Sequence, residues 1–243
     1  MITSKQNSLI KQIRSLSDKK FRDKFGLYLI EGVKLVKEAI SLSLSIKVII
    51  GTERALREID CGDIHSETVS EDVFKCVTTE VSPQGVLAII NKPNNELLPP
   101  NGSCVLLDGV SDPNNVGAIL RTATASGYKN VYLSNDCADQ FSPKSVRASM
   151  SGAFRISTAR GSLEELLKVI NLPIIVADMD GESLFNFKIE GDFCLVIGNE
   201  GHGVSKYLKD LANYTVSIPM ENGMESLNAA VSAGLLMYGL KNS

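Results

Sequence analysis

The stretch YTVSIPMENGMESLNAAVSAGLLMYG, residues 214–239, decides how the C-terminal part of the chain folds. An apolar run containing Val216 and Ile218 predicts a strand that stops at Pro219. Ser226 is then a suitable N-cap for a helix, because its hydroxyl can accept a hydrogen bond from a free backbone amide. A strand, a loop and a capped helix in this order predict a pocket of main-chain groups that can hold a polar ligand.

Apolar residues within the predicted helix recur at spacings of three and four, which indicates an amphipathic helix with this apolar face buried. They are Leu227, Val231, Leu235 and Tyr238. Asn228 lies near the start of the same helix, where packing alone would favour an apolar residue. A purely structural role for the whole stretch is the alternative at this point.

Length and composition are those of a globular protein with one large domain or two small ones. The 243 residues are 44% hydrophobic and 22% charged. No apolar run reaches the roughly eighteen residues that span a bilayer, and the N-terminus lacks the apolar core of a signal peptide, so a cytoplasmic protein is expected. Five scattered cysteines and two histidines offer neither a disulfide framework nor a set of metal ligands. No metal is expected.

Basic residues gather at the start of the chain, although the formal net charge of the whole chain is −3. Residues 1–24 carry a local charge of +5, from Lys5, Lys11, Arg14, Lys19, Lys20, Arg22 and Lys24 against Asp18 and Asp23. Basic segments of this kind can follow a phosphate backbone. The alternative is an ordinary solvated helix face.

Two α/β units joined by a linker are predicted. Residues 1–91 alternate short helices and strands and end with the apolar run GVLAII. Residues 92–102, KPNNELLPPNG, contain three prolines and a glycine and cannot sustain a helix or a strand. Residues 103–243 alternate near-continuous apolar strands with helices, which is typical of a parallel sheet covered on both faces.

Two further stretches are candidates for chemistry. In LDGVSDPNNVGAILRTATASG, residues 107–127, the apolar neighbours of Arg121 suggest that its charge needs an anionic or polar partner. In LVIGNEGHGVS, residues 195–205, three glycines allow the backbone to approach a ligand closely. Their order differs from that of dinucleotide-binding and P-loop motifs, which argues against a Rossmann dehydrogenase and against a P-loop enzyme. Glu200 is a candidate partner for Arg121, in a structural salt bridge or within a site.

Taken together, three segments resemble the motifs of the SpoU/TrmH family of RNA ribose 2′-O-methyltransferases, which belong to the SPOUT class. They are D-P-x-N-x-G-x-x-x-R-T-A at 112–123, I-G-N-E-G-x-G at 197–203 and I-P-M-x-x-x-x-E-S-L-N at 218–228. The N-terminal part, with YLIEGVKLVKEA at 28–39, is similar to the RNA-recognition domain that precedes the catalytic domain in the ribosomal-RNA branch. That domain resembles a small RNA-binding ribosomal protein.

The resemblance implies an α/β fold in which residues 103–243 form a parallel-sheet SPOUT domain with a deep trefoil knot, an exception to unknotted connectivity. Residues 1–91 would form the substrate-binding domain. It implies S-adenosylmethionine as cofactor, held largely by main-chain groups, and a homodimer with the active site near the subunit interface. Neither a metal nor a membrane is implied.

The resemblance also assigns residues by motif position. Cofactor contacts are expected from Gly198, Asn199, Ile218, Met220, Ser226 and Leu227. Catalytic or substrate-positioning roles are expected for Asn115, Arg121, Glu200 and Asn228. Arg121 would promote loss of the 2′-hydroxyl proton as a base or stabilise the forming alkoxide, and Glu200 would orient Arg121.

The substrate remains open among several RNAs. The N-terminal domain favours ribosomal RNA, 23S above all, over transfer RNA, because stand-alone transfer-RNA members usually lack it. A resistance methyltransferase acting on one ribosomal RNA loop would share every motif. The alternative from another class is a non-catalytic RNA-binding or ribosome-assembly protein.

Overall fold

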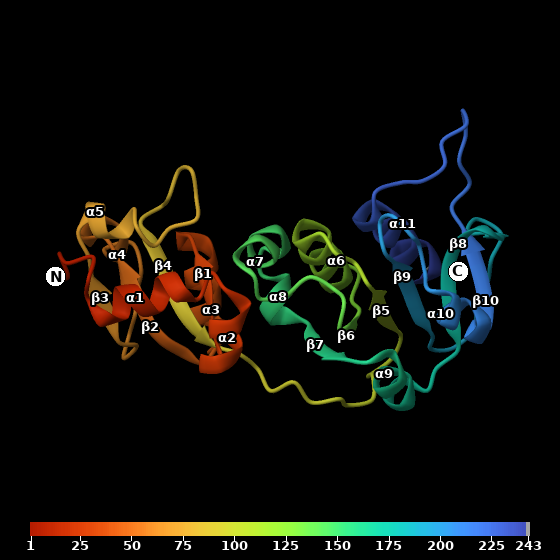
Figure 1. The fold of residues 1–243 in the computed structure, drawn as a ribbon, viewed down its shortest axis with the longest axis horizontal. Helices are drawn as coiled ribbons and strands as arrows, with labels where there is room; N and C mark the ends of the chain where they lie inside the picture. Colours follow the sequence, from red (N-terminus) through yellow and green to blue (C-terminus); the bar gives the residue numbers. More distant parts are fainter. Residues whose placement is uncertain (242–243) are drawn as a thin grey trace. The chain divides into compact units, whose positions relative to one another are not determined.

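In the computed structural model, which describes residues 1–241, the chain forms two compact α/β units (Figure 1). The first unit contains Met1–Asn94 and Phe141–Ser151, and the second contains Asn95–Gln140 and the chain from Gly152 onward. Residues 141–151 therefore belong to the first compact unit. The sequence instead predicted two continuous domains, residues 1–91 and residues 103–243. Within the described residues, no helix has the length and apolar character needed to cross a bilayer.

The first unit is a mixed sheet surrounded by short helices. Its strands follow the order β1-β4-β2-β3, in which β4 runs antiparallel to both neighbours. The strands are β1 (Leu27–Glu31), β2 (Ile46–Gly51), β3 (Ser66–Thr68) and β4 (Val86–Asn91). The helices are α1 (Ser8–Ser15), α2 (Lys19–Phe25), α3 (Val33–Ser41), α4 (Glu53–Leu56), α5 (Glu71–Phe74) and α7 (Pro143–Ser149).

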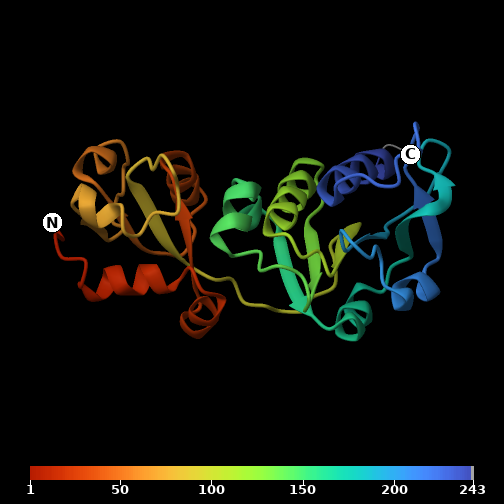
Figure 2. The same ribbon diagram turned by 45° about the horizontal axis from the view of Figure 1, so that its top comes forward.

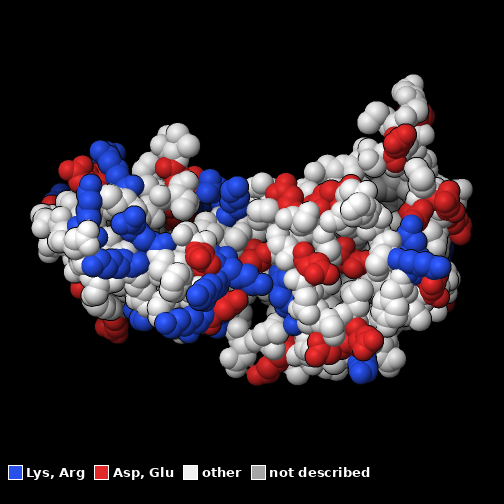
Figure 3. All heavy atoms as spheres, viewed as in Figure 1, with Lys and Arg blue, Asp and Glu red and all other residues white. Residues whose placement is uncertain are grey.

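Helix α1 is amphipathic, and this fixes which of its faces reaches solvent. Ile10 and Ile13 of α1, with Leu16 just beyond it, are fully buried in the core of this unit. Their spacing of three places them on one face of the helix. The basic residues Lys11 and Arg14 lie outside that face and are exposed. On the side drawn in Figure 3, Lys and Arg gather over this unit.

The second unit is built on a sheet whose strands all run parallel, in the order β10-β8-β9-β5-β6-β7. The strands are β5 (Cys104–Asp108), β6 (Asn130–Ser134), β7 (Ser157–Gly161), β8 (Ile174–Ser183), β9 (Cys194–Gly198) and β10 (Tyr214–Ser217). The helices are α6 (Pro113–Ala125), α8 (Gly152–Arg155), α9 (Leu163–Ile170), α10 (Lys206–Leu211) and α11 (Ala229–Lys241).

Alternate residues of the central strands serve two separate cores. Val105 and Leu107 of β5 pack in the core that includes α6 and α11 residues, whereas Cys104 and Leu106 pack in the core that includes α9 and α10 residues. This is the period-two alternation of a strand buried on both sides. The predicted parallel sheet with both faces covered is therefore confirmed. The trefoil knot remains a prediction from the resemblance.

Helix α11 differs from the prediction in its start and in its buried face. Asn228, not Ser226, caps it, because Asn228 Oδ1 accepts hydrogen bonds from the amides of Ala230 (2.9 Å) and Val231 (3.3 Å). The residues expected to be buried are instead 38–52% exposed: Leu227, Val231, Leu235 and Tyr238. The buried residues are Ala229, Ala233, Leu236, Met237 and Leu240. Both faces of the helix are apolar, so periodicity alone selected the wrong one.

Helices α6 and α11 lie side by side, as Figures 1 and 2 both show. Near their starts Asn228 contacts Asn115, and near their ends Lys241 Nζ donates to the carbonyl of Ser126 at 2.6 Å. The two helices are therefore parallel. This packing brings the start of α11 against the start of α6, which matters for the site.

Candidate functional site

Polar groups collect where β5 and β9 end. The two strands are paired neighbours, and Asp108 at the end of β5 lies opposite Gly198 at the end of β9. The loops that follow lead into α6 and α10. Ligands of parallel α/β sheets bind beyond the carboxyl ends of the strands, so this edge is the expected location for a site.

Glu200 fastens the second motif to the first. Its Oε2 accepts hydrogen bonds from the amide and the hydroxyl of Ser111, both at 3.1 Å. Its Oε1 accepts from the amide of Asp112 (3.2 Å) and from Nδ2 of Asn115 (2.8 Å). Asp112 in turn caps α6 by accepting from the amide of Asn114 at 2.8 Å. One carboxylate thus fixes the loop that enters α6.

The same hydrogen bonds explain the acidity of Glu200. Partial burial opposes its ionisation, but the hydrogen bond from Asn115 and those from backbone amides, including Ser111 and Asp112, outweigh burial and lower the pKa to about 2. Glu200 is therefore a fixed negative charge at any pH near neutrality.

Asn115 and Asn228 extend this network to the third motif. Asn115 is 7% exposed on the first turn of α6, and its Oδ1 accepts a hydrogen bond from Nδ2 of Asn228 at 2.9 Å. Because the other side of the Asn115 amide donates to Glu200, both ends of this side chain are engaged. The relay Glu200–Asn115–Asn228 therefore joins three segments far apart in the sequence.

The turn after β9 requires glycine. A Cβ at Gly198 would lie 2.2 Å from the carbonyl carbon of Gly203, because the backbone folds back on itself there. Asn199 and Gly203 exchange two backbone hydrogen bonds, both at 2.9 Å. The Asn199 side chain donates to the carbonyl of Gly109 at 2.7 Å and accepts from the amide of Gly201 at 2.8 Å. Asn199 therefore holds the turn against the loop after β5.

The remaining residues expected at the cofactor lie in or beside the loop after β10. Ile218 and Met220 are half-buried, and Ile218 packs on the core. Ser226 and Leu227 belong to an exposed segment, residues 221–228. The main chain of this segment is therefore accessible to a ligand, and half-buried apolar side chains lie beside it. This combination fits a cofactor held largely by main-chain groups with an apolar surface for a flat base.

Arg121 lies apart from the relay. It is exposed on α6, and it makes no ion pair with Glu200 within residues 1–241. Its backbone is closely approached by α8, because a Cβ at Gly152 would lie 2.9 Å from the Arg121 Cα. The expectation that the apolar neighbours of Arg121 give its charge a partner is not met within the described chain, and orientation of Arg121 by Glu200 stays a prediction. Its side chain instead reaches solvent, available to a ligand outside the chain.

Two residues near the site, Asp108 and Ser205, were not expected from the sequence. Asp108 is 7% exposed, and its Oδ2 accepts from the amide of Ser205 at 2.7 Å, which ties the end of β5 to the start of α10. Within the described residues, the buried Oγ of Ser205 has no hydrogen-bond partner. Asp108 could have been recognised in the sequence, because it ends an apolar strand directly before the first motif. Nothing in the sequence marked Ser205 as part of the site.

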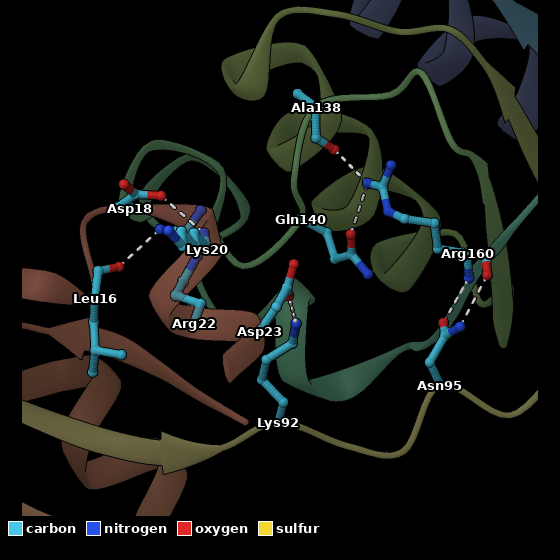
Figure 4. Close-up of polar contacts among 10 residues, drawn as sticks. All are labelled: Leu16, Asp18, Lys20, Arg22, Asp23, Lys92, Asn95, Ala138, Gln140 and Arg160. Atoms are coloured by element: carbon cyan, nitrogen blue, oxygen red, sulfur yellow. Dashed lines mark hydrogen bonds and ion pairs between the residues drawn. The ribbon is translucent and has the colours of Figure 1, made fainter. Parts of the chain in front are cut away.

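Arg160 at β7 holds the loop after β6 in place (Figure 4). Its guanidinium donates to backbone carbonyls of Ser134, Asn135, Cys137 and Ala138 and to the side chain of Gln140, at 2.7–3.3 Å. Ala138 donates its amide to the carbonyl of Val110 at 2.9 Å. Arg160 therefore supports, through one intervening loop, the segment after β5 that Glu200 fastens.

The comparisons with known proteins agree with this geometry. Residues 102–238 match the model of the SpoU rRNA methylase family, and residues 7–88 match that of an MRM3-like substrate binding domain. A 23S rRNA (guanosine(2553)-2′-O)-methyltransferase of Bacillus subtilis is 32% identical to this chain, over 99% of this chain and 98% of that protein.

Solved structures give the same result. A putative RNA methyltransferase of the TrmH family from Porphyromonas gingivalis is 32% identical over the whole of both chains, with a TM-score of 0.88. An AdoMet-bound rRNA methyltransferase from Sinorhizobium meliloti is 29% identical with a TM-score of 0.89, over 99% of this chain and 97% of that chain. The family model covers more than half of this chain, and its three motifs meet at one sheet edge. The chain belongs to the SpoU rRNA methylase family.

Proposed function

We propose that this protein transfers a methyl group from S-adenosylmethionine to a ribose 2′-hydroxyl of ribosomal RNA, most simply 23S ribosomal RNA. The observation that carries the proposal is the relay Glu200–Asn115–Asn228, which joins one residue from each of the three motifs. The full-length similarity to the Bacillus subtilis enzyme supports 23S ribosomal RNA as the substrate class. A ribosomal RNA substrate also implies the cytoplasm as the place of action.

The relay positions groups and does not itself react. Bound S-adenosylmethionine supplies an electrophilic methyl group. Gly198, Asn199, Ile218, Met220, Ser226 and Leu227 are proposed to hold it. Glu200 fixes the Asn115 amide, and Asn115 fixes Asn228 beside the exposed loop 221–228. Holding the ribose oxygen in line with the methyl group lowers the barrier by alignment alone.

Arg121 is proposed to act on the ribose 2′-oxygen. Its side chain is exposed and remains free of ion pairs in the described chain, so its charge is available to RNA. A guanidinium keeps its proton at neutral pH, which favours stabilisation of the forming alkoxide over removal of the proton by Arg121.

The two parts of the chain are proposed to divide the work. Residues 103–243 carry the relay and the proposed cofactor loops. Residues 1–91 are proposed to bind RNA, which their match to a substrate binding domain and the basic surface of α1 and α2 support. The linker, residues 92–102, connects these two functions.

A homodimer is proposed from the exposed apolar face of α11. We call Leu227, Val231, Leu235 and Tyr238 the α11 stripe; each is more than a third exposed. Leu235 also lines an apolar hollow of about 270 Å³ with Phe185 and Phe187. Exposed apolar patches of this kind mark interaction surfaces, and a second copy presents the same stripe about a two-fold axis. Such an interface would lie directly beside Asn228.

The function is tested by tritium transfer from labelled S-adenosylmethionine. The acceptors are ribosomal RNA and transfer RNA from cells that lack this protein. We expect label in ribosomal RNA at one alkali-resistant linkage, because a methylated 2′-oxygen cannot attack the neighbouring phosphate. Label in transfer RNA alone would preserve the chemistry and overturn the substrate. Binding of the cofactor without label in either RNA would identify a non-catalytic RNA-binding or ribosome-assembly protein.

A further inference from the structure

An exposed aromatic ring stands beside an open hollow on the first unit. Phe25, at the end of α2, is 40% exposed. It lines a hollow of about 540 Å³ whose other lining residues come from α1: Ser8, Leu9, Lys11, Gln12 and Ser15. The lining combines polar side chains with the apolar surfaces of Leu9 and the Phe25 ring.

The Phe25 ring is supported from behind and flanked by charge. It stacks on Phe21, with ring centroids 6.1 Å apart and planes 18° from parallel. The Lys24 ammonium lies over the Phe25 ring, 5.5 Å from its centroid. Nucleobases stack on exposed aromatic rings, so an incoming base would take the place of the ammonium on the ring face and the ammonium would turn to a backbone phosphate.

The corner between α1 and α2 is rigid. Arg22, 3% exposed, donates from Nη1 to the carbonyls of Leu16 (2.7 Å) and Ser17 (2.8 Å), and Figure 4 shows it directed at Leu16. Asp23 and Lys92 form an ion pair at 2.6 Å that ties α2 to the end of β4. These contacts hold the helix that carries Phe25 in place before any ligand arrives, which reduces the entropy lost on binding.

The cations nearby are placed for a chain of phosphates. Lys11 and Ser15 line the Phe25 hollow and also a second hollow of about 470 Å³ on the other side of α1, where Arg14 and Thr79 join them. Helix α1 is therefore a basic ridge between two hollows. The two acidic residues of this segment are already engaged, Asp18 as the cap of α2 and Asp23 with Lys92.

We propose that Phe25 stacks an unpaired base of the RNA substrate, while Lys11 and Lys24 contact the phosphates on either side of it. That this RNA is a methylation substrate rests on the proposed function; the stacking site itself does not. The site recognises the flat bases and the negative charge of single-stranded RNA, and it does not distinguish one base from another. It therefore anchors an unpaired segment of the RNA, such as a loop or a bulge.

The test compares Phe25→Ala, Phe25→Leu and Phe25→Trp in the full-length protein. The probes are a labelled oligouridylate of about 12 nucleotides and an RNA duplex of equal length, titrated at several salt concentrations. The matched control is Tyr207→Ala, since Tyr207 is an aromatic residue of α10 on the second unit and is 46% exposed. Thermal unfolding checks that each variant is folded.

We expect Phe25→Ala and Phe25→Leu to weaken oligouridylate binding about 5- to 150-fold, whereas Phe25→Trp retains it. A plot of the logarithm of the affinity against the logarithm of the salt concentration should keep its slope in the Phe25 variants. In Lys11→Ala the magnitude of this slope should fall by about one. Wild-type affinity in Phe25→Leu would show that only apolar packing matters and would overturn the proposal. So would an equal loss on the duplex. Unchanged RNA affinity in every Phe25 variant would also overturn it.

The two proposals fail separately. If wild-type protein methylates no RNA but Phe25→Ala weakens oligouridylate binding, the methyltransferase assignment fails and the stacking site stands. If ribosomal RNA is methylated and Phe25→Ala changes neither its KM nor oligouridylate affinity, the stacking site fails alone. If both stand, Phe25→Ala raises the KM for RNA and leaves kcat unchanged.

Discussion

Asn228 Nδ2 donates to Asn115 Oδ1 across 2.9 Å, although the two residues are 113 positions apart in the chain. The contact links the cap of α11 to the first turn of α6. Because Asn115 is engaged at its other end by Glu200, neither asparagine can rotate without breaking a hydrogen bond. The site is consequently a single polar unit.

The first prediction concerns this unit. Asn115→Ala and Asn228→Asp should each lower kcat for methyl transfer about 10- to 100-fold by misaligning the reacting groups. The Asp variant keeps an N-cap oxygen for α11, so its unfolding temperature should stay close to that of the wild type. The double variant should lose little more than either single variant, since residues that act as a unit are not additive. Additive losses would show that the two side chains act independently.

The second prediction concerns acid stability. The pKa of Glu200 is lowered to about 2 in the folded chain from an ordinary value of 4.5. The group therefore contributes stability above about pH 4.5, which is lost as the pH falls toward 2. Because Glu200 is largely exposed, we expect a contribution of about 1 kcal/mol after allowance for screening. In Glu200→Gln, the free energy of unfolding measured with urea should vary less with pH over that range. An unchanged dependence of this free energy on pH in the variant would contradict the assignment.

The third prediction concerns the turn after β9. Gly198→Ala places a Cβ 2.2 Å from backbone that cannot move aside, so it should cost about 2–4 kcal/mol and abolish cofactor binding. Gly201→Ala is the matched control in the same turn, because its nearest neighbour would be 3.5 Å away. Calorimetric titration with S-adenosylmethionine and thermal unfolding measure both effects. Normal cofactor affinity in a folded Gly198→Ala protein would be inconsistent with this account.

The fourth prediction concerns Arg121. Since its side chain is exposed, Arg121→Ala should change the free energy of unfolding by less than about 0.5 kcal/mol. It should nevertheless lower kcat at least about 100-fold, the cost of removing a donor from a forming oxyanion. Arg121→Lys should restore only part of the rate, because an ammonium lacks the planar fork. Normal turnover in the Ala variant would remove Arg121 from the mechanism.

The fifth prediction concerns the α11 stripe. Leu235→Arg should convert a dimer to monomers in sedimentation velocity, because it places a charge in an apolar interface. Leu211→Arg is the matched control, since Leu211 on α10 has the same 46% exposure as Leu235. A wild-type protein that sediments as a monomer, or a Leu235→Arg protein that remains dimeric, would contradict the proposed interface.

The site residues that could be predicted from the sequence were those that lie in short motifs. Asn115, Glu200 and Asn228 were each marked by neighbouring glycines, prolines or a helix start, and all three meet in the structure. Parallel strands place the segments that follow them at one sheet edge, so motifs after different strands were bound to lie near one another.

The errors arose where neighbours in sequence are not neighbours in space. The apolar neighbours of Arg121 suggested that its charge has a partner within the chain, but successive residues of a helix point about 100° apart. Its flanking residues face the core, and Arg121 does not. Likewise, α11 is apolar on both sides, and only the packing against α6 determines which side is buried. Arg160 was missed because its partners lie 20 to 26 positions earlier.

The parallel packing of α6 and α11 also has a consequence for synthesis of the protein. A ribosome adds about 5–20 residues per second, so Asn228 emerges roughly 6–23 s after Asn115. Until then Asn115 lacks the hydrogen bond from Asn228, and the exposed loop before α11 is not completely synthesised. A nascent chain can therefore offer the RNA-facing surface of its first unit well before it can assemble a site for methyl transfer. Recognition precedes catalytic competence in time as well as along the chain.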